Sequence, residues 1–157
     1  IMGGPTKYYD YSTKNMKHIF SIFYKLLKKK DFQLVVIPSM RTPLNTIHYA
    51  KEFFGENHTV IMNVNKKAYL SALALSENII VTCDSSSMIS EAALTGKPIY
   101  IANILPKKND IRFQRFRNLF RELNITRNLG EDMENWSYQK LDETNRVAKI
   151  INEKIKN

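Results

Sequence analysis

The sequence predicts an α/β fold in which a parallel β-sheet carries helices on both faces. Short apolar runs rich in β-branched residues alternate with amphipathic helical segments along residues 14–102, which is the pattern of right-handed βαβ units. The runs are continuously apolar, as expected for strands that are covered on both faces. A length of 157 residues, with 43% hydrophobic and 25% charged residues, fits one globular domain and excludes a disordered chain.

The first helix is predicted over residues 14–28, where apolar side chains recur at helical spacing with lysines between them. Ser12 or Thr13 is the expected N-cap of this helix. Buried strands are predicted over residues 34–37, 59–62, 79–82 and 99–102. The helices between these strands are predicted over residues 45–54, 66–75 and 88–94.

The alternation of strands and helices stops after Pro106. The apolar side of a predicted helix over residues 111–123 consists of Phe113, Phe116, Phe120 and Leu123. Arginines occupy much of its other side, and we interpret them as a solvated face because the phenylalanines fall on the core side. The alternative is a surface for single-stranded nucleic acid, since arginine and phenylalanine interleave over residues 112–117. A polar stretch over residues 124–138 precedes a last predicted helix at about 142–155.

The net charge of +9 favours an acidic partner, such as a nucleic acid, an anionic membrane surface or a phosphorylated small molecule. The apolar runs are far shorter than the roughly 20 residues that span a bilayer. Cys83 is the sole cysteine and the three histidines lack the spacing of metal ligands, so we expect a reducing, cytoplasmic location, no metal and no cofactor. Because the sequence starts at Ile1 and not at methionine, we also expect a fragment of a longer protein.

The loops that follow the predicted strands are the candidate binding sites, because ligands of an open parallel sheet bind beyond the carboxyl ends of its strands. Gly3 and Gly4 follow the presumed first strand and would let backbone N–H groups approach a phosphate, with Lys7 nearby. An ordinary tight turn is an equal alternative. Arg41 lies in a proline-bounded loop after the next strand, where it either pairs with a phosphate or stays on the surface.

The most informative stretch covers residues 84–98. A strand ends there in the hydroxyl side chains Ser85, Ser86 and Ser87, which open a helix and form, with its first N–H groups, a natural anion site. Helix capping is the alternative role of these serines. Glu91 has no Ser or Thr at position 88 with which to form a capping box, so we predict another role for its carboxylate. Gly96 is expected to end the helix.

The segments GGPTK, PSMRTP, TCDSSSMISEAALTGKP and RFQRF follow one another over about residues 1–120. With these segments the chain resembles the glycosyltransferase-like family of mitochondrial fission proteins, also known as predicted nucleoside-diphosphate-sugar epimerases. It is more distantly similar to the C-terminal nucleotide-sugar domain of GT-B enzymes such as UDP-N-acetylglucosamine 2-epimerase. The resemblance implies that residues 1–157 form a single Rossmann-like domain, the C-terminal half of a GT-B type protein.

In those enzymes a glycine loop and a serine-rich helix start hold the diphosphate, and a glutamate on the helix binds the ribose. The resemblance implies that the diphosphate is faced by Gly3, Gly4, Ser85, Ser86 and Ser87. It also implies that Glu91 binds the ribose, while Arg41 belongs to the motif of the fission-protein family itself.

We therefore expect the nucleotide-diphosphate-sugar binding domain of a GT-B glycosyltransferase, with the missing N-terminal domain as its partner. A nucleoside-diphosphate-sugar epimerase is the near alternative. The alternative from another class is a noncatalytic interaction module that docks peripherally on an anionic membrane or a protein partner. The domain alone is expected to bind the donor weakly and to catalyse nothing, so no catalytic residue is assigned. No specific nucleic-acid partner is expected.

Overall fold

The computed structural model describes residues 1–29 and 31–156 and is a parallel α/β structure. The strands of the described chain are β1 (Val35–Val36), β2 (Thr59–Val60), β3 (Ile79–Thr82), β4 (Ile99–Ala102) and β5 (Thr126–Asn128). The helices are α1 (Thr13–Lys29), α2 (Leu44–Phe54), α3 (Lys66–Leu75), α4 (Ser86–Ala93), α5 (Ile111–Glu122) and α6 (Glu143–Lys156). The predicted Rossmann-like fold class is therefore confirmed.

The first residues of the chain join two groups of strands, β1–β2 and β3–β4–β5, into one surface. Met2 bridges Pro38 in parallel and donates its N–H to the carbonyl of Ile37 at 2.8 Å. On its other side the segment pairs with β3, where Thr82 N–H donates to the carbonyl of Ile1 at 3.2 Å. The order across the sheet is β2, β1, N-terminal segment, β3, β4, β5, which is the doubly wound order of Rossmann folds.

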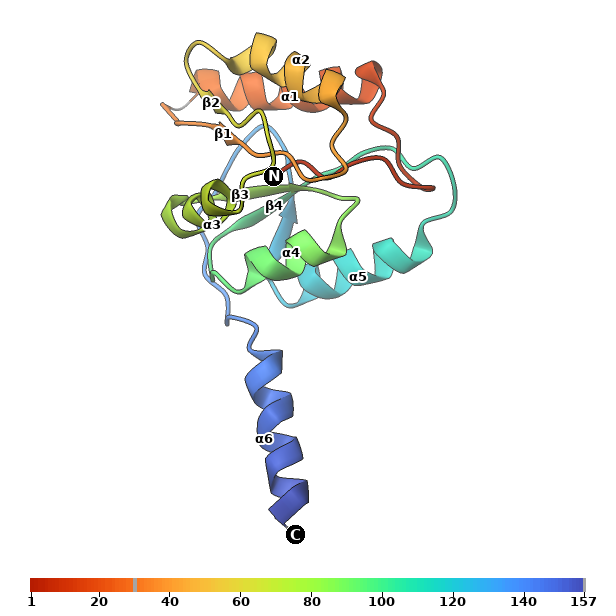
Figure 1. Cartoon of the computed structure of the whole chain (residues 1–157), viewed down its shortest axis with the longest axis vertical. Coiled ribbons are helices and arrows are strands. Elements are labelled where there is room, and N and C mark those ends of the chain that lie inside the picture. Colours follow the sequence, from red (N-terminus) through yellow and green to blue (C-terminus); the bar gives the residue numbers. More distant parts are fainter. Residues whose placement is uncertain (30, 157) are drawn as a thin grey trace.

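Helices cover both faces of this sheet, as Figure 1 shows with α1 and α2 above it and α4 and α5 below it. Leu26, Met16, Ile19 and Phe20 are the buried side chains of α1. The Phe20 ring lies 5.3 Å from the ring of Tyr49 and 5.1 Å from that of Phe54, so α1 and α2 share an aromatic core. Below the sheet, Ile89, Ala92 and Ala93 bury the inner face of α4.

The chain departs from the prediction in the region after α5. Residues 126–128 form the edge strand β5 within the stretch expected to be irregular, because Thr126 and Ile125 are buried next to β4. The expectation of a solvated arginine face is wrong for Arg117, whose side chain is only 16% exposed. Leu123, expected on the core side, is 49% exposed.

The start of α4 and the last helix also differ from expectation. α4 begins at Ser86, two residues before the predicted start, because the Ser85 side chain caps it. α6 has the predicted bounds to within a residue, but it projects from the body and buries none of its side chains (Figure 1). Among the described residues, no helix has the length and apolar character needed to cross a bilayer.

Candidate functional site

The candidate site lies where the chain order of the sheet reverses. The N-terminal segment and β3 are neighbours in the sheet, yet the segment leads to α1 above the sheet and β3 leads to α4 below it (Figure 1). The two loops diverge at this point, and doubly wound folds bind their ligands in a crevice here, beyond the carboxyl ends of the strands. Gly3, Gly4 and the residues that follow β3 lie there.

Asp84 is the side chain that joins the loops of this crevice. Its carboxylate is fully buried and accepts hydrogen bonds from the Gly4 N–H at 3.0 Å, the Tyr11 hydroxyl at 2.6 Å and the Arg41 guanidinium at 3.2 Å. Burial and the neighbouring carboxylate of Asp84 raise the pKa of Tyr11, which keeps its hydroxyl protonated as a donor. Sequence reasoning missed both Asp84 and Tyr11. An acidic residue two positions after a buried strand was the available signal for Asp84.

Gly3 and Gly4 are needed because other atoms lie too close for a side chain. A Cβ on Gly3 would lie 2.1 Å from Asp84 Oδ2, and a Cβ on Gly4 would lie 2.1 Å from the Arg41 carbonyl oxygen. The Gly3 N–H donates to Thr82 Oγ1 at 2.8 Å, and the Gly4 N–H donates to Asp84. In this structure the two N–H groups therefore join the strands, and the glycines permit close approach of the backbone.

Arg41 is held at the mouth of the crevice by two different acceptors. Its guanidinium donates to Asp84 and, at 3.1 Å, to the carbonyl oxygen of Gly4. The Arg41 side chain is nevertheless 43% exposed, so it remains accessible from solvent. The neighbouring Thr42 hydroxyl lies 2.9 Å from the Met2 carbonyl oxygen and ties the same loop to the N-terminal segment. An anion in the crevice would meet a positioned arginine.

The N-terminus of α4 faces the same crevice from the end of β3. Ser85 is buried and caps the helix, with its hydroxyl 3.5 Å from the Met88 nitrogen. The Ser85 and Ser87 hydroxyls lie 3.2 Å apart, and Ser87 is exposed. Capping thus accounts for Ser85 alone, while Ser86 and Ser87 occupy the first turn, whose N–H groups have no partner within a helix.

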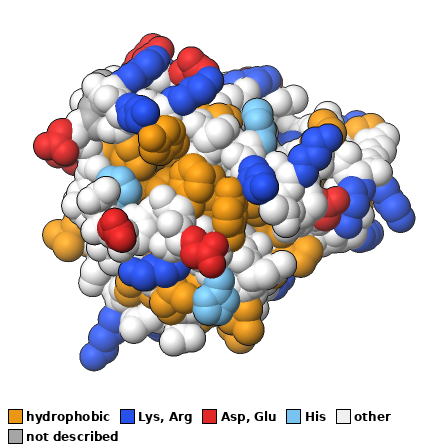
Figure 2. Space-filling model, turned by 90° about the horizontal axis from the view of Figure 1, so that it is seen from above, with side chains coloured by type: hydrophobic (Ala, Val, Ile, Leu, Met, Phe, Trp, Pro, Cys, Tyr) orange, Lys and Arg blue, Asp and Glu red, His pale blue; other side chains and the backbone are white. Residues whose placement is uncertain are grey.

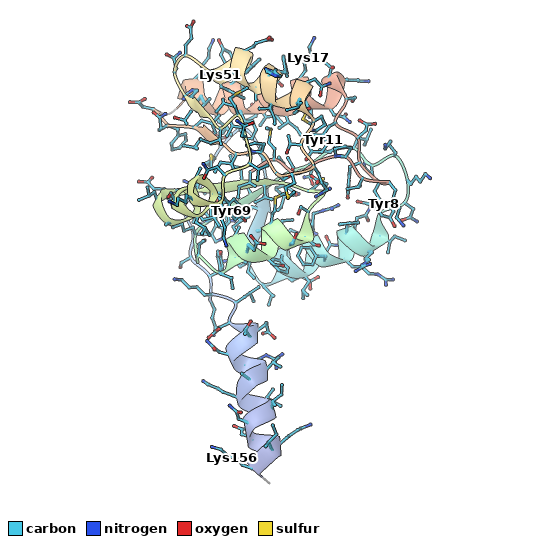
Figure 3. The ribbon with its side chains drawn as sticks, in the orientation of Figure 1. Tyr8, Tyr11, Lys17, Lys51, Tyr69 and Lys156 are labelled. Atoms are coloured by element: carbon cyan, nitrogen blue, oxygen red, sulfur yellow. The ribbon has the colours of Figure 1, made fainter. Side chains whose placement is uncertain are left out.

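Glu91 lies one turn further along α4, on the same face as Ser87. Its carboxylate is exposed and accepts a hydrogen bond of 2.7 Å from the Tyr69 hydroxyl of α3. Burial and this carboxylate raise the pKa of Tyr69. Figure 3 labels Tyr69 where α3 approaches α4. Sequence reasoning anticipated a role for Glu91 outside capping but missed Tyr69, because no local pattern pairs residues 22 positions apart.

Lys7, another predicted site residue, has its described contact outside this group. It is exposed, and its ammonium lies 5.0 Å from the centroid of the Tyr8 ring. The structure thus groups Gly3, Gly4 and Arg41 around Asp84, directly before Ser85, and pairs Glu91 with Tyr69.

A second polar cluster joins the N-terminal loop to α5. The buried Asp110 carboxylate accepts hydrogen bonds from the Tyr9 hydroxyl, from Gln114 and, at 3.0 Å, from Arg117. Burial alone would raise the pKa of Asp110, but these hydrogen bonds outweigh it and the pKa is lowered. Arg117 also donates to the Cys83 carbonyl at 3.2 Å, which links α5 to the end of β3.

Cys83 is a packing residue of the core. It is 1% exposed, and burial raises the pKa of its thiol to about 11, so the reactive thiolate is scarce at neutral pH. Among the described residues, no group of His, Cys, Asp and Glu side chains has the arrangement of a metal site.

Comparison with known proteins identifies the family. The family described as Mitochondrial fission ELM1 matches residues 1–155. The chain belongs to this family. The resemblance stated from the GGPTK, PSMRTP and serine-rich segments is thereby confirmed. Two curated relatives are similar to this ELM1-family chain. The uncharacterized protein RP120 of Rickettsia prowazekii is 30% identical over 96% of the chain. The mitochondrial fission protein ELM1 of Arabidopsis thaliana is 33% identical over 74% of the chain.

The ELM1-family chain spans less than half of each of these relatives and shares its fold with a solved enzyme. It spans 44% of the Rickettsia protein and 28% of the Arabidopsis protein. The UDP-GlcNAc 2-epimerase of Neisseria meningitidis, solved with UDP-GlcNAc bound, superposes with a TM-score of 0.51 over 83% of this chain and 31% of its own, at 16% identity. That likeness supports a Rossmann-like, GT-B-type fold.

Proposed function

We propose that this domain binds a nucleotide-diphosphate sugar and is the donor-binding part of a GT-B glycosyltransferase. The observation that carries the proposal is the position of the α4 N-terminus, which follows the carboxyl end of β3 where the loops after β3 and after the N-terminal segment diverge. A nucleoside-diphosphate-sugar epimerase would use the same binding site, because both reactions start from the same donor. The structural neighbour is named as such an epimerase.

The diphosphate would bind at the first turn of α4. Free N–H groups and the positive end of the helix dipole favour an anion at a helix N-terminus. The hydroxyls of Ser86 and Ser87 add donors in that turn, and the exposed part of Arg41 supplies a charged fork from the neighbouring loop. Gly3 and Gly4 let the N-terminal loop lie close to β3. Their own N–H groups donate to Thr82 and Asp84 and not to the ligand.

The ribose would bind at Glu91. An exposed carboxylate accepts hydrogen bonds from two adjacent hydroxyls, and the Tyr69 hydroxyl fixes one carboxylate oxygen at 2.7 Å and leaves the other free. Ser87 and Glu91 are four residues apart on one helix, about one turn of 5.4 Å. That spacing suits a phosphate and the ribose attached to it.

The longer relatives bear on catalysis. This chain spans less than half of either curated relative. In such a longer protein, other domains would bind the sugar acceptor and supply the catalytic side chains. This domain supplies only part of the contacts to the donor. We therefore expect a dissociation constant of about 0.1 to several mM, equivalent to about 3 to 5.5 kcal/mol.

A noncatalytic docking module remains the second candidate, and one observation favours it. Seen from above α1 and α2, hydrophobic side chains form a band bordered by basic, acidic and histidine side chains (Figure 2). Tyr24 and Phe53 are exposed at this face, and Lys28 lies over the Tyr24 ring at 4.6 Å. Aromatic and lysine side chains together are typical of surfaces that contact anionic membranes.

The nucleotide proposal is tested by titrating the protein with UDP, GDP, ADP and CMP in ¹H–¹⁵N correlation spectra. We expect at least one of them to shift the amides of residues 84–91. The proposal is wrong if none does so at 10 mM.

Glu91→Gln separates a binding role from a structural one. Loss of the charged acceptor should weaken nucleotide binding by about 1.5 to 3 kcal/mol while the fold persists. Glu52→Gln on the exposed surface of α2 makes the same charge change away from the crevice and should leave binding unaltered. If the Glu91 variant melts several degrees lower yet binds normally, the glutamate is architectural.

A further inference from the structure

A second polar cleft lies between α5 and the carboxyl ends of β4 and β5. Its volume is about 280 Å³, and α5 contributes four polar side chains to it: Gln114, Arg117, Asn118 and Arg121. Buried Ile101 and Thr126 also line the cleft, together with Arg127 of β5 and with Asn103 and Asn128 at the ends of the two strands. None of these residues belongs to the α4 crevice described above.

The composition of this cleft is unusual for the space between a helix and a sheet. The four α5 residues follow the spacing i, i+3, i+4 and i+7, so they share one face of the helix. A helix that covers a sheet normally turns an apolar face toward it. In α5 the phenylalanines form a neighbouring stripe, with Phe120 buried, and the polar face overhangs the ends of β4 and β5.

The cleft is positively charged. Arg117 has a carboxylate partner in Asp110, at 3.0 Å, and Arg127 pairs with Glu134. Arg121 donates only to the neutral side-chain oxygen of Asn118, also at 3.0 Å. Among the described residues that line the cleft, none is acidic. The Asn103 amide donates to Asn128 at 2.9 Å, which holds two further amide groups at the rim. One uncompensated guanidinium and several amides therefore surround the hollow.

We propose that this cleft binds the phosphate group of a small ligand, with Arg121 as its main contact. A tetrahedral phosphate uses donors from several directions, and here guanidinium and amide groups approach from the helix and from both strand ends. The volume equals several times the roughly 30 Å³ of one water molecule, so a phosphate with a small polar body fits. This site is independent of the proposed nucleotide site at α4.

The probes are inorganic phosphate and glucose 6-phosphate, each titrated at constant ionic strength with neutral glucose as a reference. Binding is followed through the side-chain amide signals of Asn103, Asn118 and Asn128 and the Nε–H signal of Arg121. We expect both phosphates to shift these signals and glucose to leave them in place. Tighter binding of glucose 6-phosphate would identify a phosphorylated metabolite as the source, and equal binding would identify free phosphate.

Arg121→Gln should weaken phosphate binding about tenfold or more, the order expected when a charge-assisted hydrogen bond is lost. Arg115→Gln is the matched control, because Arg115 is exposed on the same helix and does not line the cleft. Its effect should stay below about twofold. Asn128→Asp, which places a negative charge at the rim, should also abolish binding without touching α5.

Failure of this proposal is distinct from failure of the nucleotide proposal. UDP shifts at residues 84–91 should be the same in the Arg121→Gln variant as in the parent protein. The phosphate site is refuted if neither probe shifts the cleft signals, or if the Arg121 and Arg115 variants lose phosphate binding equally.

Discussion

Asp84 shows how a single buried charge can organise a binding crevice. An isolated carboxylate without access to water is costly, and it is tolerated when partners satisfy its oxygens. Here Gly4, Tyr11 and Arg41 all donate to it. Each partner comes from a different part of the chain, so the carboxylate positions the glycine loop and the arginine together. The nucleotide proposal depends on that arrangement.

Gly4→Ala tests the close approach of this loop. The added methyl group would lie 2.1 Å from the Arg41 carbonyl oxygen, a backbone atom that moves only with its loop. We expect the free energy of unfolding to fall by about 1 to 3 kcal/mol in chemical denaturation. Gly130→Ala is the control, since nothing lies within 4 Å of its Cβ, and it should change stability by less than about 0.5 kcal/mol. Equal stability of the two variants would contradict the packing argument.

Asp110→Asn tests the cluster that ties α5 to the N-terminal loop. The pKa of Asp110 is lowered in the folded protein, so its contribution to stability is full above the ordinary pKa of Asp, about 3.9, and is lost as pH falls through the lowered value. Removing one partner of a buried ion pair costs about 3 kcal/mol. In urea titrations the variant should be less stable than the parent at pH 7, with a smaller difference at pH 3.

Asp132→Asn is the comparison for that experiment. Asp132 pairs with Lys29 at 3.0 Å, but its side chain is 79% exposed, and exposed pairs contribute little. Its effect should be below about 1 kcal/mol. A gap between parent and Asp110→Asn that did not shrink in acid would show that the carboxylate charge is not what stabilises the cluster.

Among the secondary-structure elements, α4 contributes the largest number of the candidate binding residues. Ser85 caps its start, Glu91 meets α3 from its outer face, and Gly96 follows it at a φ of 74°. A positive φ suits glycine, which explains why the helix ends there as the sequence predicted. The capping and stop signals are local, whereas the contact of Glu91 with Tyr69 depends on how α3 packs.

In contrast to α4, the amphipathic helix α6 buries none of its side chains against the rest of the described chain. Val147, Ile151 and Ile155 form its apolar stripe and are 44%, 50% and 77% exposed. A helix of 14 residues is marginal in water without packing. We expect its amides to exchange with deuterium within seconds, while those of β4 stay protected. Protection of α6 equal to that of β4 would mean that its stripe is covered in solution.

In the whole molecule, the net charge of +9 does not by itself indicate a nucleic-acid partner, because the arginines of α5 have different surroundings. Arg117 is tied to Asp110 and Arg121 lines a cleft, which leaves Arg112 and Arg115 exposed on α5. The aromatic side chains of α5 that would stack on bases are partly or fully buried, namely Phe113, Phe116 and Phe120. Stacking platforms need exposed rings.

We therefore expect a 20-nucleotide RNA to bind no more tightly than the roughly 1 to 100 μM of nonspecific electrostatic association at 150 mM salt. Fluorescence anisotropy with labelled RNA measures this affinity. The double variant Arg112→Gln and Arg115→Gln should reduce it only by the loss of two charges. Submicromolar binding that depends on these arginines, to RNA or to anionic vesicles, would favour the docking module over the nucleotide-binding domain.

The sequence by itself determined the fold class and nearly all of the elements. Helix periodicity, apolar runs and caps depend only on residues that are close together in the chain. It also pointed to Ser85 and Glu91 through a strand end followed by a helix start. It missed β5, since a three-residue edge strand has too few positions to show a pattern. Only the tertiary structure joined Tyr11 to Asp84, Tyr69 to Glu91 and Arg117 to Asp110, because these contacts form between elements far apart in the chain whose meeting depends on how the sheet and helices pack.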